Sequence, residues 1–399
     1  MDQNLQRFIE YVQIDTQSDD TSDSIPSTAK QLNLSRLLLK QLQDLGMKCH
    51  LNEFGIVYGY MEGETSLDPI GLNSHVDTAL ECSGANVKPQ IIKNYDGGII
   101  SLGHGYSLSP DEFPSLLKQI GSDLVVTSGD TLLGADDKAG IAIIMAVLHY
   151  YHDHPEIKHH PICVCFTPDE EIGRGPDHFD AKEFGAKYAF TIDGGDPNEI
   201  AYETFNAAHA QILIHGKSIH PGEAKGKLVN AMSVAFAFDA ALPPLMRPEF
   251  TADREGFNHL VGIEGNVDLV KMAYIIRNHD KDKLEEQKQT FLDVAKNIER
   301  QYPGAKIEVS LGDDYRNMAE IILSHPEVLE KARSAFAKLG ITPVSNPVRG
   351  GTDGATFSFK GCPTPNLGTG SYNHHGRFEY LSVREFDLMI EIVKEILKA

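Results

Sequence analysis

The chain has 399 residues, which is long for a single hydrophobic core and predicts about two domains. Hydrophobic residues make up 41% and charged residues 23%, a balance that excludes a disordered or fibrous chain. With 36 Lys and Arg against 57 Asp and Glu, the formal charge is −21, so nucleic acid and anionic membranes are poor partners.

The five cysteines form no CxxC pair, and a chain of this length with an odd number of them predicts free thiols in a reducing compartment. The first twenty residues lack the basic and apolar regions of a signal peptide. No segment approaches 18 consecutive apolar residues, so we expect no membrane span. The predicted location is the cytoplasm.

The first half of the chain alternates helices with short buried strands. Leucines at 34, 38, 42 and 45 predict a helix over 28–45, and residues 139–148 predict a buried helix. Short apolar runs at 54–61, 70–74, 162–166 and 188–192 predict strands. This alternation favours a mixed, mostly parallel α/β sheet with helices on both faces.

After residue 200 the pattern changes to α+β. Strands are predicted at 210–215 and 269–276, with helices at 229–240 and 283–301. The α/β pattern returns with helices at 325–339 and about 382–398. We therefore expect one domain formed by 1–205 and 316–399, interrupted by an inserted α+β domain of 206–315.

Acidic and histidine side chains follow the predicted strands. His75 and Asp77 share one side of a strand end, where open α/β sheets place ligands. They suit a metal ligand with its orienting partner or an acid–base pair, and a plain surface hydrogen bond is the alternative. Further clusters contain Asp136 and Asp137 before the buried helix, Asp169, Glu170 and Glu171 after a strand, Asp193 after the next, and His374 and His375 near the C-terminus.

Each cluster alone has an ordinary structural explanation: a helix cap, an exposed acidic turn, a turn-forming aspartate or a solvated loop histidine. Together they favour a two-metal hydrolase, because histidine and carboxylate ligands without thiolates suit Zn²⁺, Mn²⁺ or Co²⁺. A denser histidine group at 149, 152, 154, 159 and 160 lacks organised acids, and we expect a solvated connection there.

Eight motifs in this order make the chain resemble a known family: HVDT, LLGADDKAGIA, FTPDEEIG, TIDGG, IHPGEAKG, YIIR, VRGGTDGA and YNHHG. They are similar to the peptidase T family of tripeptide aminopeptidases, within the larger group of dizinc aminopeptidases, carboxypeptidases and aminoacylases. The resemblance covers nearly the whole chain. The 58 residues from 78 to 135, together with VRGGTDGA, are its most specific part.

The resemblance implies a zinc-peptidase-like catalytic domain with two divalent cations, most simply zinc, with manganese or cobalt possible. His75 and Asp193 would hold one ion, Glu171 and His375 the other, and Asp136 would bridge them. Asp77 would orient His75, and Glu170 would be the general base. Members usually have tyrosine where this chain has His374, so either histidine could coordinate, and the motif register favours His375. The group also commonly has a cis peptide bond after the bridging aspartate.

The inserted domain would be a lid that binds substrate. His220 would stabilise the oxyanion, while Asn230, Arg277 and Arg349 would bind the peptide backbone and its C-terminal carboxylate. Ordinary alternatives are structural salt bridges for the arginines and a hinge-loop role for His220.

The expected function is hydrolysis of the N-terminal bond of tripeptides with a free N-terminus by a monomer or homodimer. A dipeptidase, aminoacylase or carboxypeptidase on the same scaffold is the alternative, and an inactive scaffold protein or a metal phosphohydrolase is less compatible with the residues.

Overall fold

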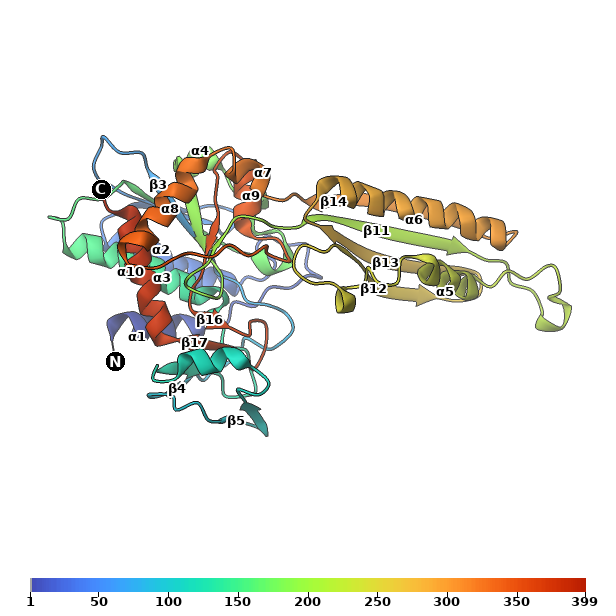
Figure 1. Cartoon of the computed structure of the whole chain (residues 1–399), viewed down its shortest axis with the longest axis horizontal. Helices are drawn as coiled ribbons and strands as arrows, with labels where there is room; N and C mark the ends of the chain where they lie inside the picture. Colours follow the sequence, from blue (N-terminus) through green and yellow to red (C-terminus); the bar gives the residue numbers. More distant parts are fainter. Residues whose placement is uncertain (1) are drawn as a thin grey trace. The chain divides into compact units, whose positions relative to one another are not determined.

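A computed structural model describes residues 2–399, which form two compact units (Figure 1). Unit 1 runs up to Tyr202 and continues over Met318–Asn346 and Thr352–Ala399, and unit 2 comprises Glu203–Asn317 and Pro347–Gly351. The short segment 347–351, which the sequence placed with the C-terminal part of the first domain, lies with unit 2 because Arg349 donates hydrogen bonds to the carbonyls of Asp253 and Glu255.

Unit 1 contains a seven-stranded mixed sheet in the order β1-β2-β8-β3-β9-β15-β10. The central strands β8, β3, β9 and β15 are parallel, and the pairs at both ends are antiparallel. The bounds are β1 (Lys48–Leu51), β2 (Val57–Met61), β3 (Ile70–His75), β8 (Ile162–Thr167), β9 (Tyr188–Ile192), β10 (Ile200–Ala201) and β15 (Asn366–Leu367).

Helices cover both faces of this sheet. Along β8, Ile162, Val164 and Phe166 point into one core, and Cys163 and Cys165 point into a second core on the opposite face. This double burial explains why the strand is continuously apolar, and it confirms the predicted α/β fold. The first core contains α1 (Gln3–Val12), α2 (Gln31–Asp44), α3 (Ala135–Asp153), α7 (Ala319–Ile322), α8 (Pro326–Lys338) and α10 (Val383–Leu397), and the second contains α4 (Ala181–Phe184) and α9 (Asp353–Phe359).

The 58 residues from 78 to 135 build a smaller antiparallel sheet with the C-terminal segment, in the order β16-β17-β7-β4. Leu381 pairs with Val125, and Val125 pairs in turn with Ile91. The chain just before α3 is therefore anchored to the segment that contains His375. The bounds are β4 (Gln90–Ile92), β7 (Leu124–Val126), β16 (Ser371–Tyr372) and β17 (Tyr380–Ser382), beside the hairpin β5 (Ile100–Gly103) and β6 (Tyr106–Leu108).

Unit 2 is a four-stranded antiparallel sheet in the order β12-β13-β11-β14, with two helices on one face. Alternate residues of β11, such as Ala210 and Ile212, pack against Phe238 of α5 and Phe291 of α6. The two predicted strands and two predicted helices are present, and the sequence missed β12 and β14. The bounds are β11 (Asn206–His215), α5 (Ala231–Ala241), β12 (Phe257–Gly265), β13 (Leu269–Asn278), α6 (Lys281–Gln301) and β14 (Lys306–Tyr315).

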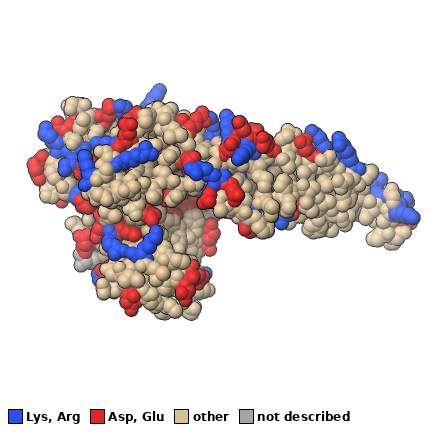
Figure 2. Space-filling view, in the orientation of Figure 1, with Lys and Arg blue, Asp and Glu red and all other residues tan. Residues whose placement is uncertain are grey.

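On the face drawn in Figure 2, acidic and basic side chains are interspersed. None of the helices formed by residues 2–399 combines the length and the apolar character that crossing a membrane requires.

Candidate metal centre

All five predicted ligands belong to unit 1, and neighbouring strand ends position three of them. His75 is the last residue of β3, Asp193 follows β9 directly, and Glu171 lies in the short 3₁₀ turn η2 (Glu170–Ile172) after β8. Parallel strands end at the same edge of a sheet, which places these side chains together. Asp136 comes from the first turn of α3, and His375 from the loop between β16 and β17.

The carboxylate of Asp136 lies between two histidines. Its Oδ1 atom is 3.0 Å from His75 Nε2, and its Oδ2 atom is 3.4 Å from His375 Nε2. On the His75 side, Asp193 Oδ1 lies 4.0 Å from the same Nε2 atom. On the other side, Glu171 Oε2 lies 3.1 Å from His375 Nε2. The Asp136 carboxylate therefore lies between two histidines, each with one further acid near it, as expected for the predicted bridging ligand.

The donor atoms are close enough to share cations. Ligand atoms of His75, Asp136 and Glu171 all lie within 4.8 Å of one another, and so do those of His75, Asp137 and Asp193. Asp137 is engaged with the backbone, because its carboxylate accepts hydrogen bonds from the N–H groups of His75 and Gly140. The peptide bond between Asp136 and Asp137 is cis.

Burial and close charges perturb the acids of this cluster. Burial raises the pKa of Glu171 to about 11 and that of Asp193 to about 6. Burial would raise the pKa of Asp136 too, but hydrogen bonds from His375 and His75 hold it well below its ordinary value. For His75, burial lowers the pKa, yet hydrogen bonds to Asp136 and Asp77 raise it well above the ordinary value.

Asp77 connects a ligand to the loop of the predicted base. His75 Nδ1 lies 3.3 Å from Asp77 Oδ1, the position expected of an orienting carboxylate. The same carboxylate accepts hydrogen bonds from the backbone N–H groups of Glu170 at 3.0 Å and Glu171 at 3.1 Å. The sequence predicted the contact with His75 and missed the contacts with the loop. One buried carboxylate thus holds residues from two strand ends.

The charges of neighbouring acids perturb Glu170. Burial raises its pKa well above the ordinary value, and the carboxylates of Asp193 and Asp353 add to the rise while His75 opposes it. Such a perturbed acid is typical of a group that exchanges protons with a substrate.

The cluster fits divalent cations. Glu171 Oε1 is buried and accepts no hydrogen bond from any described residue. A buried carboxylate oxygen without a donor is costly, and a cation beside it would remove that cost. The donors are imidazole nitrogens and carboxylate oxygens, the ligand types that Zn²⁺, Mn²⁺ and Co²⁺ accept.

Two neighbouring acids have roles that the sequence did not reveal. Asp169 accepts hydrogen bonds from the backbone N–H of Ser27 and the amide of Gln31, so it fastens the N-terminal segment rather than facing the cluster. Glu81 Oε1 lies 3.4 Å from His375 Nδ1, on the side of the ring away from Asp136. A carboxylate at a histidine's second nitrogen is the usual orienting partner of a metal ligand. These contacts join distant segments, so no local sequence signal predicts them.

The two adjacent C-terminal histidines have different surroundings. Nε2 of His375 lies 3.1 Å from Glu171 Oε2 and 3.4 Å from Asp136 Oδ2. The Nδ1 atom of His374 also lies 3.6 Å from Asp136 Oδ2, but its Nε2 atom is hydrogen bonded to Ser371 Oγ at 2.8 Å. We expect His375→Ala to abolish binding of one cation, and His374→Phe to keep both cations and most of the activity. Metal content per chain and the hydrolysis rate check this expectation, and the reverse pattern would assign the ligand to His374.

Metal binding to this cluster is expected to strengthen as the pH rises. In the metal-free protein, Glu171 retains a proton up to its raised pKa of about 11 and a bound cation would displace that proton. Each proton released raises the apparent affinity about tenfold per pH unit.

The measurement is the rise in melting temperature at one buffered free-metal concentration. We expect a larger rise at pH 8 than at pH 6. In the metal-free protein alone, the stability linked to Glu171 is lost as the pH increases, because the folded chain keeps a proton that the unfolded chain has released. An equal rise at both pH values would contradict the assignment of Glu171 as a ligand.

The four predicted substrate-binding residues lie in unit 2, where each has local partners. Asn230 caps α5 by accepting a hydrogen bond from the N–H of Met232, and His220 Nδ1 accepts one from Gly222. Arg277 donates to the carbonyls of Ala208 and Ile276. Arg349 donates to the loop at 251–255. Their substrate roles remain predictions.

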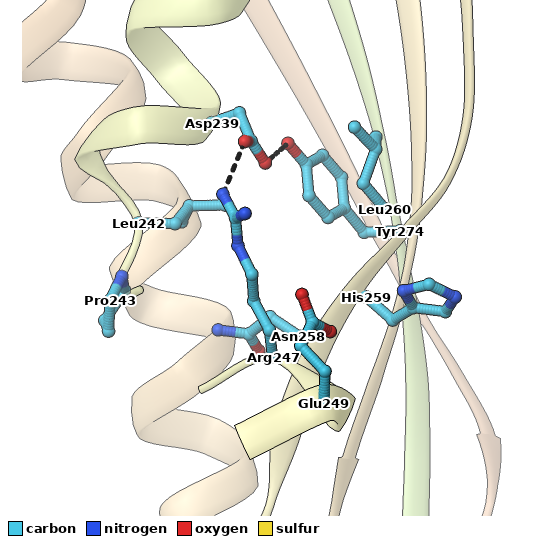
Figure 3. Close-up of a pocket in the computed structure, with 9 residues that line it drawn as sticks. All are labelled: Asp239, Leu242, Pro243, Arg247, Glu249, Asn258, His259, Leu260 and Tyr274. Atoms are coloured by element: carbon cyan, nitrogen blue, oxygen red, sulfur yellow. Dashed lines mark hydrogen bonds and ion pairs between the residues drawn. The ribbon is translucent and has the colours of Figure 1, made fainter. Parts of the chain in front are cut away.

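Unit 2 also has a cavity of about 180 Å³, and none of the predicted site residues lines it. Figure 3 shows Asp239 between the guanidinium of Arg247 and the hydroxyl of Tyr274, at 2.7 and 3.1 Å. The Asp239 carboxylate therefore accepts hydrogen bonds from both Arg247 and Tyr274. We interpret this network as structural support for the sheet and α5.

Comparison with known proteins identifies the family. The model of the Peptidase family M20/M25/M40 matches residues 132–399. Peptidase T of Clostridium perfringens (strain 13) is 46% identical over 396 residues, which cover 98% of each chain. The chain belongs to this peptidase family. Peptidase T of Geobacillus sp. (strain WCH70) is also 46% identical, over 99% of this chain and 97% of the relative.

Two solved structures agree with the fold. An aminopeptidase PepT of Bacillus cereus has a TM-score of 0.78 at 25% identity, over 99% of this chain and 97% of that one. A tripeptidase of Staphylococcus aureus has a TM-score of 0.80 at 23% identity, with the same coverage. The predicted resemblance to peptidase T and the prediction of a metallopeptidase are confirmed.

Proposed function

We propose that the chain is a metallo-aminopeptidase that removes the N-terminal residue of tripeptides with the help of two divalent cations. The observation that carries this proposal is the carboxylate of Asp136, whose two oxygens face His75 and His375 on opposite sides. The peptidase T relatives at 46% identity support the choice of reaction within the family. Zinc is the simplest metal for these ligands, and manganese or cobalt can share them. The five free cysteines support a reducing compartment, and we propose the cytoplasm.

The chemistry divides between the cations and the chain's own residues. Two bound cations would lower the pKa of water and polarise the scissile carbonyl. Glu170 would accept the water proton and deliver it to the leaving amine. Asp77 would keep Glu170 in position, because its carboxylate holds both the base loop and the ring of His75. His75, Asp193, Glu171, His375 and Asp136 would hold the ions.

Residues of unit 2 would select the substrate. His220 would donate to the oxyanion, and Asn230 would bind the peptide backbone. Arg277 and Arg349 would clamp the C-terminal carboxylate, since a guanidinium binds a carboxylate through two parallel hydrogen bonds. Anchoring that carboxylate at a fixed distance from the cations would select peptides of three residues.

A single substrate series tests the proposal. A dipeptide, tripeptide and tetrapeptide of one residue type, a C-amidated tripeptide and an N-acetyl amino acid are assayed with chelator-treated protein, with and without Zn²⁺, Mn²⁺ or Co²⁺. We expect metal-dependent release of the N-terminal residue chiefly from the free tripeptide. Preference for the dipeptide or the acetylated amino acid would point to a dipeptidase or aminoacylase, and release of the C-terminal residue would point to a carboxypeptidase. No cleavage with any metal would refute the proposal.

A further inference from the structure

Glu379 is a buried acid that contacts the chain around Asp136. Its side chain is 1% exposed, and it follows His375 by four residues on the segment between β16 and β17. One carboxylate oxygen accepts hydrogen bonds from the backbone N–H groups of Leu133 and Gly134, both at 2.8 Å. The other oxygen accepts one from the N–H of Asp136 at 2.9 Å. Both oxygens are thus used to hold the chain at the start of α3.

The start of α3 depends on this distant acid. A helix begins with N–H groups that have no partner within the helix, and a side chain at the cap position usually satisfies one of them. Here the cap residue is Gly134, which has a φ of 79° and no side chain to offer. Glu379 supplies an acceptor for the N–H of Asp136 in the first turn, and it also binds the N–H groups of Leu133 and Gly134 just before the helix. A buried carboxylate is costly unless hydrogen-bond donors replace water, and three backbone N–H groups do so here.

The segment between β16 and β17 contacts both the backbone and the side chain of Asp136. Glu379 binds the N–H of Asp136, while His375 Nε2 lies 3.4 Å from the Oδ2 atom of the same residue. Tyr380, next to Glu379, pairs with Val126 in the small sheet, and the chain runs from there to Leu133. The spacing between the bridging carboxylate and His375 is therefore set by one compact piece of structure.

We propose that Glu379 is a positioning residue of the metal centre, which aligns Asp136 with His375 so that the two can share a cation. It is neither a ligand nor a group that touches substrate. The inference rests on the proposed two-metal site, but it concerns metal affinity and does not depend on which peptide is cleaved.

The test compares Glu379→Gln with a matched control. Glutamine has one acceptor oxygen, and its amide group would face at least one backbone N–H. Glu385→Gln serves as the control, because Glu385 accepts hydrogen bonds from Gln119 and Tyr372 in the same region and none from residues 133–136 in the described structure. Zinc affinity is measured by competition with a coloured chelator, and folding of the metal-free proteins by circular dichroism and melting temperature.

We expect Glu379→Gln to lower zinc affinity by about 10- to 100-fold, the effect typical of losing a partner that orients a ligand. The KM for peptide should stay within about twofold while kcat falls, since Glu379 does not contact substrate. Glu385→Gln should bind zinc as the unmodified protein does. A Glu379→Gln protein that melts earlier but binds zinc with unchanged affinity would overturn the proposal. So would an equal loss of affinity in the control.

A second measurement uses the unmodified protein, in case Glu379→Gln does not fold. Hydrogen exchange of the amides of Leu133, Gly134 and Asp136 is followed without metal and with zinc. We expect all three to be protected in the metal-free protein, because Glu379 accepts their protons without needing a cation. Exchange as fast as that of exposed loops in the metal-free folded protein would contradict the proposal. If the unmodified protein binds no zinc at all, the proposed function fails instead, whatever the exchange shows.

Discussion

Glu170→Gln is expected to bind two cations almost normally and to lose about 10³-fold in kcat, the scale typical of removing a general base. The amide cannot accept the water proton, but it keeps the size of the carboxyl group. The backbone N–H of residue 170 would still bind Asp77, so the neighbouring Glu171 stays in place. Metal content per chain and single-turnover hydrolysis of a tripeptide measure the two effects separately.

The control for this variant is Glu62→Gln, since Glu62 is an exposed acid paired with Lys48 on the surface. It should retain both metal content and kcat. Substantial hydrolysis by Glu170→Gln would remove Glu170 from the mechanism. Loss of cations from that variant would instead make it a ligand.

Asp136→Asn is expected to release both cations and to lower metal affinity by more than about 100-fold, beyond the usual effect of losing an outer partner. Each oxygen of Asp136 faces a different histidine, and an amide would present one neutral oxygen and one N–H in their place. Asp137→Asn is the matched comparison. Its carboxylate bonds to backbone N–H groups, so this variant should melt earlier but still bind two cations.

Metal titration of the two variants distinguishes the adjacent acids, which the sequence alone could not. Asp137 lies within 4.8 Å of His75 and Asp193, so it is a possible ligand by distance alone. If Asp137→Asn lost both cations and Asp136→Asn kept them, the bridge would be Asp137. In that case Asp137→Asn should also lose hydrolysis and Asp136→Asn should retain it.

Many strands and predicted ligands of unit 1 could be predicted because each strand and the polar residue that ends it lie within a few residues of one another in the sequence. The strand β8 is an unbroken apolar run, and acids follow it at once, which marks both a buried strand and its carboxyl end. The same holds for β3 with His75 and for β9 with Asp193. A parallel sheet then brings these ends together without further information.

Contacts between distant segments could not be predicted in this way. The sequence predicted a helix over 28–45, whereas α2 begins at Gln31, and the N–H of Ser27 just before it bonds to Asp169. Glu379 reaches residues more than 240 positions earlier. Such partners depend on tertiary packing, which periodicity and spacing do not encode.

In unit 2 the missed strands have an exposed face. β14 alternates partly buried residues with exposed Lys306 and Glu308, and most of β12 is exposed. A strand with few buried residues gives a weak alternation signal, so propensity alone did not reveal it. The stronger alternation of β11 and β13 was sufficient for their prediction.

The central claim is that Asp136 bridges two cations held by His75 and Asp193 on one side and by Glu171 and His375 on the other. The most direct measurement is a crystal structure of the protein grown with Zn²⁺, with anomalous diffraction collected at the zinc absorption edge. We predict two peaks about 3.5 Å apart, one on each side of the Asp136 carboxylate. A single peak, or two peaks that Asp136 does not bridge, would contradict the account.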